Sequence, residues 1–103
     1  MRYEERKKIM AKFNLGQTVM TSGVAHKVAN DVEFSKFVLK SMGRHVNGDW
    51  GCLSKEDKQL NDSALKNGNE RIFSAYEESP LPKLWIITER DRSVTTALFP
   101  SEY

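Results

Sequence analysis

Hydrophobic residues in the first half of the chain recur at helical spacing. Phe34, Phe37, Val38 and Met42 follow the order i, i+3, i+4, i+8, which places them on one face of a helix over residues 32–43. Polar residues fill the positions between them. The pattern therefore predicts an amphipathic helix whose apolar face is buried.

Capping signals define a further helix downstream. Ser54 has the N-cap residue type, and Asp57 stands where a capping box normally carries Glu or Gln. Asn67-Gly68 supplies residues that tolerate the left-handed geometry of a helix C-cap. We expect the buried face of this helix to carry Leu60, Ala64 and Leu65.

Two other helical segments are predicted nearer the N-terminus. Residues 2–12 read as a charged helix, and residues 24–29 as a short helix that follows a turn at Ser22-Gly23. Asn30-Asp31 interrupts this short helix and can cap the next one.

The last third of the chain has the residue types of β-strands. Residues 71–76, 83–88 and 93–99 each read as a strand, and the middle one is apolar on both faces, which is typical of a central strand. Short connections favour an antiparallel meander. Residues 17–21 are rich in β-formers and can add a fourth strand.

Together these elements predict an α+β fold, with helices packed on one face of a three- to four-stranded antiparallel sheet. A chain of 103 residues suits a single domain, 1–103. Residues 1–13 are expected to form an N-terminal helical extension of that domain.

The amino-acid composition says more about the cellular compartment of the protein than about its function. Sixteen basic and fourteen acidic residues leave a net charge of +2, which indicates no strong preference for a charged partner. Cys52 is the single cysteine, so an internal disulfide is excluded and a reducing compartment is expected. No apolar run approaches the roughly 18 residues that span a bilayer, and the N-terminus lacks a signal-peptide core. We therefore expect a cytoplasmic protein that does not act at a membrane.

The segment Arg44 to Gly51 concentrates candidate chemistry. It holds a guanidinium, an imidazole, a carboxylate and an indole within eight residues, and two glycines frame it. Glycines this close together are typical of a shaped loop. Loops that carry such side chains often position them for binding or catalysis.

The residue sequence of several segments resembles that of a known family. The residues are Arg44-His45, Gly48-Asp49-Trp50-Gly51, Trp85-Ile86-Ile87-Thr88-Glu89, Asp91-Arg92-Ser93-Val94-Thr95-Thr96, Pro100 and Glu102-Tyr103. This pattern is similar to that of small, plasmid-related bacterial proteins encoded on plasmids, prophages and other mobile elements. The resemblance covers residues 15–103 and implies a mobile-element setting, with no particular chemistry.

One functional hypothesis is metal-independent RNA cleavage. A strand followed by helices and then a run of strands is similar to small ribonuclease toxins of the barnase and RelE type. Such enzymes need a general base, a general acid and cations for the phosphorane. His45 would be the base, Glu89 or Tyr103 the acid, and the phosphate would be held by Arg44, Arg90 and Arg92. The alternative interpretation pairs Arg44 with Asp49 or Glu89 and makes His45 a helix cap.

A second hypothesis is binding through an aromatic and basic surface. This surface would include Trp50, Tyr76, Trp85 and the turn 90–92. In the alternative interpretation, Trp50 and Trp85 both pack into the core. The predicted binding residues are Arg44, His45, Asp49, Trp50, Arg90 and Arg92.

Metal binding is a third possibility that the spacing does not favour. His26, His45, Asp49 and Cys52 have ligand side chains but fit no recognised zinc pattern, so no metal or cofactor is expected. Cys52 is instead expected to be a small core residue.

The function that we predict from the sequence is binding. The chain would be a mobile-element accessory protein, for example an anti-CRISPR-type inhibitor that engages a host protein or nucleoprotein complex. The alternative is the metal-independent RNase, with RNA as the partner. The sequence leaves the oligomeric state open.

Overall fold

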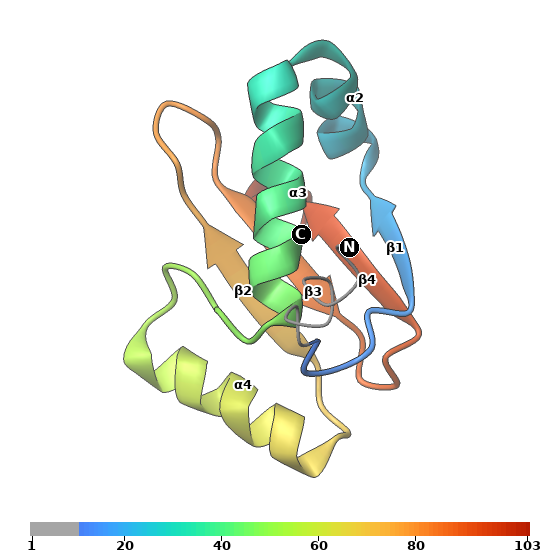
Figure 1. The fold of residues 1–103 in the computed structure, drawn as a ribbon, viewed down its shortest axis with the longest axis vertical. Coiled ribbons are helices and arrows are strands. Elements are labelled where there is room, and N and C mark those ends of the chain that lie inside the picture. Colours follow the sequence, from blue (N-terminus) through green and yellow to red (C-terminus); the bar gives the residue numbers. More distant parts are fainter. Residues whose placement is uncertain (1–10) are drawn as a thin grey trace, which may run out of the picture.

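The computed structural model describes residues 11–103, and its elements follow the predicted order (Figure 1). The segments are β1 (Gln17–Met20), α2 (Ser22–Asn30), α3 (Val32–Val46), α4 (Lys55–Asn67), β2 (Ile72–Tyr76), β3 (Leu84–Thr88), β4 (Val94–Leu98) and the 3-10 turn η1 (Pro100–Glu102). Most of the helix predicted over residues 2–12 lies outside the described residues, and residues 11–16 are not helical.

The four strands form one sheet in the order β1-β4-β3-β2. The pairs β2–β3 and β3–β4 are antiparallel, as the short connections predict, and β3 is central. β1 pairs in parallel with β4, in the register Gln17 to Val94. The predicted α+β class is confirmed, but the sheet is mixed and not purely antiparallel. The three described α-helices and two strands separate β1 from β4, so no tight turn constrains their relative direction.

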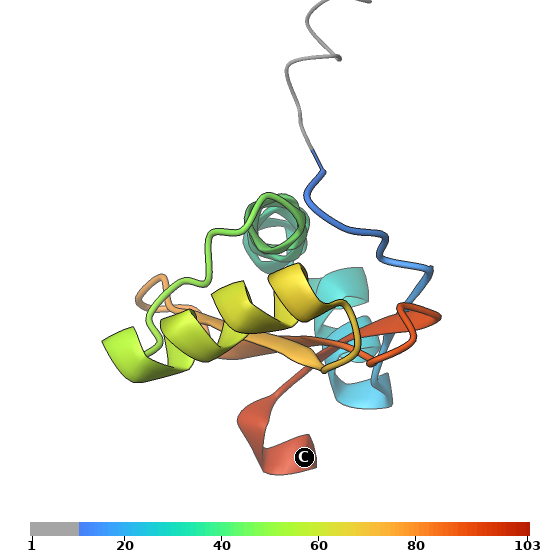
Figure 2. The ribbon, with the colours of Figure 1, turned by 90° about the horizontal axis from the view of Figure 1, so that it is seen from below.

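The sheet separates two unequal sides of the molecule (Figure 2). α3 lies across one face, while α4 runs beside the edge strand β2. On the opposite face, the C-terminal turn η1 projects from the sheet. We call the side that carries α3 the helix face and the other side the open face.

α3 begins and ends with local signals. Asp31 caps its N-terminus by accepting a hydrogen bond from the Phe34 N–H at 3.1 Å. The helix continues to Val46, three residues beyond the predicted end at residue 43. Arg44 and His45 therefore belong to its last turn, where the helix dipole favours cations, and the loop predicted over residues 44–51 begins only at Asn47. Because Gly43 is helical, it does not break the helix.

The boundaries of the other helices also follow their caps. Thr21 is the N-cap of α2, which begins at Ser22, where a turn was predicted. Ser54 caps α4 through the Asp57 N–H at 3.1 Å, and Gly68 ends it at φ 78°, so both predicted caps are confirmed.

The buried face of α4 differs from the predicted one. Leu60 is 64% exposed, whereas its polar neighbour Asn61 is 5% exposed. The side-chain amide of Asn61 donates to the Phe73 carbonyl at 2.5 Å and accepts from the Phe73 N–H at 3.1 Å. Asn61 thus takes the place of a neighbouring strand on the outer edge of β2. Further along the same edge of β2, the Cys52 N–H donates to the Ala75 carbonyl at 2.8 Å.

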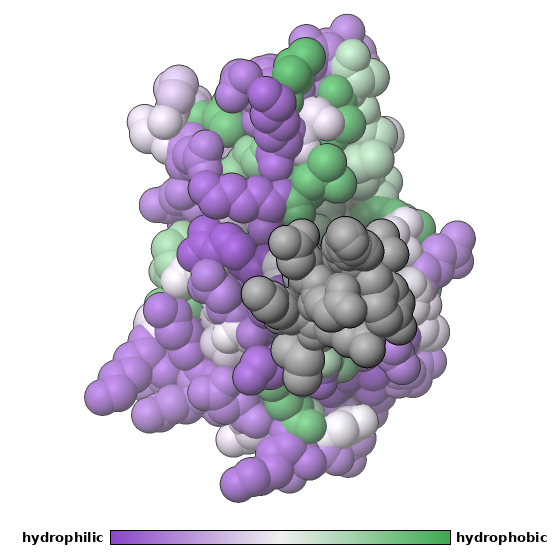
Figure 3. Space-filling view, in the orientation of Figure 1, coloured by the Kyte–Doolittle hydropathy of each residue, from purple (hydrophilic) through white to green (hydrophobic). Residues whose placement is uncertain are grey.

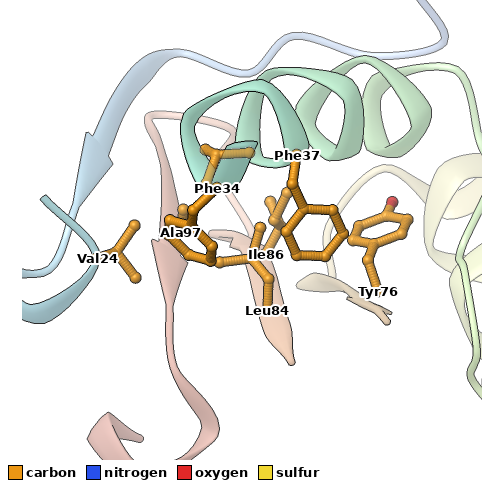
Figure 4. Packing of buried hydrophobic residues seen from close by; sticks show 8 residues of the cluster. Val24, Phe34, Phe37, Tyr76, Leu84, Ile86 and Ala97 are labelled. Carbon is orange, nitrogen blue, oxygen red and sulfur yellow. The ribbon is translucent and has the colours of Figure 1, made fainter. Parts of the chain in front are cut away.

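Two hydrophobic clusters fill the helix face. The larger one lies between α3, α2 and the sheet (Figure 4), and it contains Val24, Phe34, Phe37, Val38, Tyr76, Leu84, Ile86 and Ala97. The smaller one joins the loop after α3 to α4 and the start of β2, and it contains Trp50, Ala64 and Ile72. Phe13, which precedes β1, packs against the smaller cluster.

Candidate functional site

His45 lies at the centre of a buried polar chain on the helix face. Its Nδ1 contacts the Ser74 hydroxyl and its Nε2 lies 2.9 Å from the Thr88 hydroxyl. The Thr88 hydroxyl is 2.7 Å from that of Thr95, which donates to the Leu15 carbonyl at 2.6 Å. Since a carbonyl only accepts, the hydroxyls align in one direction, and His45 donates from Nε2 and accepts at Nδ1.

This environment keeps the imidazole neutral. His45 is fully buried, and burial lowers its pKa from 6.5 to about 3. Both ring nitrogens already have protein partners. A general base needs an accessible lone pair and a pKa near the working pH. His45 therefore has the properties of a structural residue and not of a base that an RNA substrate could reach.

Arg44 and Asp49 form a separate pair, which is more exposed than His45. The guanidinium donates two hydrogen bonds to the carboxylate, Nε to Oδ2 at 2.7 Å and Nη2 to Oδ1 at 3.1 Å. It also lies 4.8 Å from the ring centroid of Tyr76, whose hydroxyl donates to the Asp49 carbonyl at 2.7 Å. The hydrogen bond from Arg44 lowers the pKa of Asp49. This pair fastens the loop to β2, which matches the alternative interpretation of Arg44.

Trp50 belongs to the core and not to a surface. Its side chain is 4% exposed, and its indole N–H donates to the Asp62 carboxylate of α4 at 3.0 Å. The ring lies 5.9 Å from that of His45 and 6.3 Å from that of Phe13. The next residue, Gly51, adopts φ 75° and passes so close to β2 that a Cβ would lie 1.9 Å from the Ala75 carbonyl oxygen.

Arg92 ties the β3–β4 turn to the end of α4. Its guanidinium donates to the carbonyls of Glu70 at 2.6 Å and of Ala64 at 3.2 Å. The second carbonyl belongs to the last turn of α4, where cations are favoured. Arg90 and Glu89, on the same turn, are exposed. The guanidinium of Arg92 is thus used within the protein.

The structure brings together only part of each predicted set. His45 and Trp50 are neighbours in the interior, and Arg92 approaches them through Phe13, which lies 5.9 Å from its guanidinium. Arg44 and Asp49 form their own surface pair. Tyr103 lies on the open face against Trp85, so the sheet separates it from His45. His45 and Tyr103 are therefore not placed around one substrate, and the other proposed acid, Glu89, is exposed whereas His45 is buried.

The residues with ligand-type side chains do not form a metal site. Within residues 11–103, no three His, Cys, Asp or Glu side chains are arranged to hold one ion. Cys52 is exposed, so its predicted place in the core is wrong.

The open face carries a site that the sequence reasoning did not assemble. A hollow of about 340 Å³ there is lined by Arg71, Phe73, Trp85, Ile87 and Tyr103. We call it the aromatic hollow. The ring centroid of Trp85 lies 5.0 Å from that of Phe73 and 5.7 Å from that of Tyr103, both edge to face.

Strand periodicity explains why these residues meet. In the register of β2 and β3, Phe73 pairs with Ile87. Two residues further along β2, Ala75 pairs with Trp85. Alternation puts all four side chains on the face opposite Ser74 and Ile86. The signal was present in the odd-numbered apolar positions of both strands. The pattern alone does not show that α3 packs on the other face of the sheet.

Comparisons with family models, with curated proteins and with solved structures give no match for this chain. The resemblance to plasmid-related proteins stays a prediction. Among the described helices, none is both long and apolar enough to cross a membrane.

Proposed function

We propose that this protein acts by binding a partner protein through the aromatic hollow, in the setting of a mobile element. The partner would be a host protein or the protein part of a nucleoprotein complex, as for an anti-CRISPR-type inhibitor. The observation that supports binding is the hollow itself, which three aromatic rings and an arginine line at the surface. Aromatic residues and arginine are the side chains enriched at the centres of protein interfaces.

The chemistry of the hollow favours an apolar side chain of the partner. Phe73, Trp85 and Ile87 form its apolar base, and Tyr103, which is 72% exposed, forms one rim. Arg71 lies beside it, with its guanidinium 5.7 Å from the Tyr103 ring and its Nη1 donating to the Tyr103 hydroxyl at 3.2 Å. A partner would insert a leucine, methionine or phenylalanine and place a carboxylate against Arg71.

Nucleic acid is a weaker fit to this site. Binding to a phosphate backbone depends on several free cations. The net charge is +2, and Arg44 and Arg92 are held by Asp49 and by backbone carbonyls. We therefore propose a protein partner, and RNA binding becomes an outcome of the test.

The experiment is a partner capture with matched variants. Tagged wild type, Tyr103→Ala and Arg71→Glu are incubated with host lysate, and Leu60→Ala serves as a control because Leu60 is exposed on α4, away from the hollow. A protein recovered by wild type and by Leu60→Ala, but lost with both hollow variants, supports the proposal once the purified pair reconstitutes at a fixed ratio. Equal recovery by all four proteins contradicts it.

The same preparations test catalysis. Total RNA is incubated with wild type and with His45→Gln. Cleavage by wild type that His45→Gln lacks would overturn the binding-only function. Retention of RNA without cleavage, reduced by Arg71→Glu, would replace the protein partner with a nucleic acid.

A further inference from the structure

The outer edge of β1 has backbone groups that no other described residue uses. In the parallel pairing with β4, the N–H groups of Gln17 and Thr21 donate to β4 or its flank at 2.9 and 3.1 Å. Residues alternate along a strand, so the N–H and C=O groups of Thr18 and Met20 point away from the sheet. Within residues 11–103 they form no hydrogen bond.

The two edges of the sheet are treated differently. On β2, the Asn61 amide satisfies Phe73, and the loop after α3 satisfies Ala75. β1 has the sequence Gln-Thr-Val-Met, without the proline, lysine or bulge that commonly protects an exposed edge. An open edge beside a closed one indicates that β1 is available for strand pairing.

A groove accompanies the open edge. Between β1 and α3 lies a space of about 460 Å³, lined by Thr18, Val19, Met20, Val38, Leu39 and Met42. Leu39 is 73% exposed and Met20 44% exposed. A strand added beside β1 would direct alternate side chains along this groove.

The side of α3 above the groove carries no formal charge. At helical periodicity its residues are Val32, Ser35, Leu39, Met42, Gly43 and Val46. The charged residues Glu33, Lys36, Lys40 and Arg44 lie on the other side of the helix. Figure 3 shows the same division, with hydrophobic residues on the side of α3 that faces β1 and hydrophilic ones across from it.

We propose that a second copy of this chain occupies this edge, through antiparallel pairing of β1 with β1 about a two-fold axis at Val19. In this register Thr18 of one copy faces Met20 of the other, and the outward N–H and C=O groups of each satisfy those of its partner. The exposed Met20 side chain of each copy enters the groove of the other. The β1 strand of a second copy is thus an extended segment that can pair with this edge, and its Met20 is an apolar residue at the position that faces the groove.

The size of the contact sets the strength to expect. The four residues of β1 and the groove of each copy make a small interface, and small interfaces are usually transient. The dimer should therefore form with increasing protein concentration. If the proposed function also holds, pairing in one continuous sheet would turn both aromatic hollows to the same side and allow bivalent binding.

A disulfide trap tests the register directly. In a Cys52→Ser background, Val19→Cys places two thiols at a non-hydrogen-bonded antiparallel pair, where Cα atoms lie about 4.5 Å apart. Mild oxidation should give a covalent dimer on a non-reducing gel. The matched control is Gln17→Cys on the same strand, whose own counterpart would lie about 13 Å away along the partner strand. Cross-linking of both variants to the same extent, or of neither, overturns the register.

Edge-blocking variants test the dimer without a cross-link. Thr18→Pro removes an outward N–H that the fold does not use, and Met20→Lys puts a charge on the edge. Light scattering at rising concentration should show a wild-type dimer and monomeric variants, with circular dichroism and melting temperature confirming that each variant folds. Wild type that stays monomeric, or folded variants that dimerise as wild type does, would overturn the proposal. Capture of a partner by monomeric Met20→Lys would leave the function of the hollow intact.

Discussion

The side chains of His45 and Tyr103 lie on opposite faces of the same sheet. His45 contacts Ser74 and Thr88 on the helix face, while Tyr103 packs against Trp85 on the open face. The two residues therefore differ in role: the imidazole joins α3 to the sheet from inside, and the phenol remains at the surface. Of the two side chains, only that of Tyr103 is accessible to a partner.

Burial of His45 predicts that the protein loses stability as the pH falls. The imidazole titrates near 6.5 in the unfolded chain but at about 3 in the folded protein, so below pH 6.5 the unfolded chain takes up the proton first. The stability is fully present above pH 6.5 and decreases by up to about 1.4 kcal/mol per pH unit towards pH 3. We expect a loss of about 2 kcal/mol between pH 6.5 and 4.5, measured by urea unfolding.

The control for this pH dependence is His45→Gln, which keeps an amide in place of the ring but cannot titrate. Its free energy of unfolding should be lower than that of wild type at neutral pH and nearly flat from pH 6.5 to 4.5. A wild-type profile equally flat over that range would show that His45 is not held neutral.

Trp50→Ala should destabilise the fold strongly. The buried ring is removed from the cluster with Ala64 and Ile72, and loss of such a ring typically costs about 3–5 kcal/mol. Trp50→Phe keeps most of the packing but leaves Asp62 without its indole donor, so a loss of about 1–2 kcal/mol is expected. Chemical unfolding of both variants checks this order. A stable Trp50→Ala protein would instead place the ring at a contact surface.

Asn61 and Leu60 provide a matched pair on α4. Asn61→Ala removes both hydrogen bonds to Phe73 and should cost about 1–3 kcal/mol, because the strand edge loses its partner. Leu60→Ala, at the neighbouring exposed position, should change stability by less than about 0.5 kcal/mol. Melting curves at several concentrations would also show whether the uncovered edge of β2 promotes aggregation. Equal effects of the two substitutions would contradict the edge role of Asn61.

Gly51 and Gly43 should respond in opposite directions to alanine. At Gly51 a Cβ would lie 1.9 Å from the Ala75 carbonyl oxygen and φ is 75°, so Gly51→Ala should cost more than about 2 kcal/mol. At Gly43, inside α3, no atom lies within 4 Å of the added Cβ, and Gly43→Ala should gain about 0.5–1 kcal/mol of stability from helix propensity. Thermal unfolding of both single variants tests the contrast. Destabilisation by Gly43→Ala would contradict the open space assigned to that position.

Local signals along the chain predict the elements of this protein and most of their boundaries. Caps such as Asp31, Ser54 and Gly68 act within a few residues, and strand alternation needs only the strand itself, so both can be recognised locally. The central place of β3 followed from its two apolar faces. The predicted end of α3 at residue 43 was too early. Gly43 can adopt helical geometry, and the contacts of His45 with the sheet stabilise the additional turn.

The tertiary structure decided what each face meets. It paired β1 in parallel with β4, buried Asn61 in place of Leu60, enclosed Trp50 and His45, and left Phe73 and Trp85 on the open face only partly buried. None of these outcomes depends on neighbours along the chain. Each depends on which distant segment lies opposite a side chain, because burial and hydrogen bonding are set by the whole surroundings of a residue.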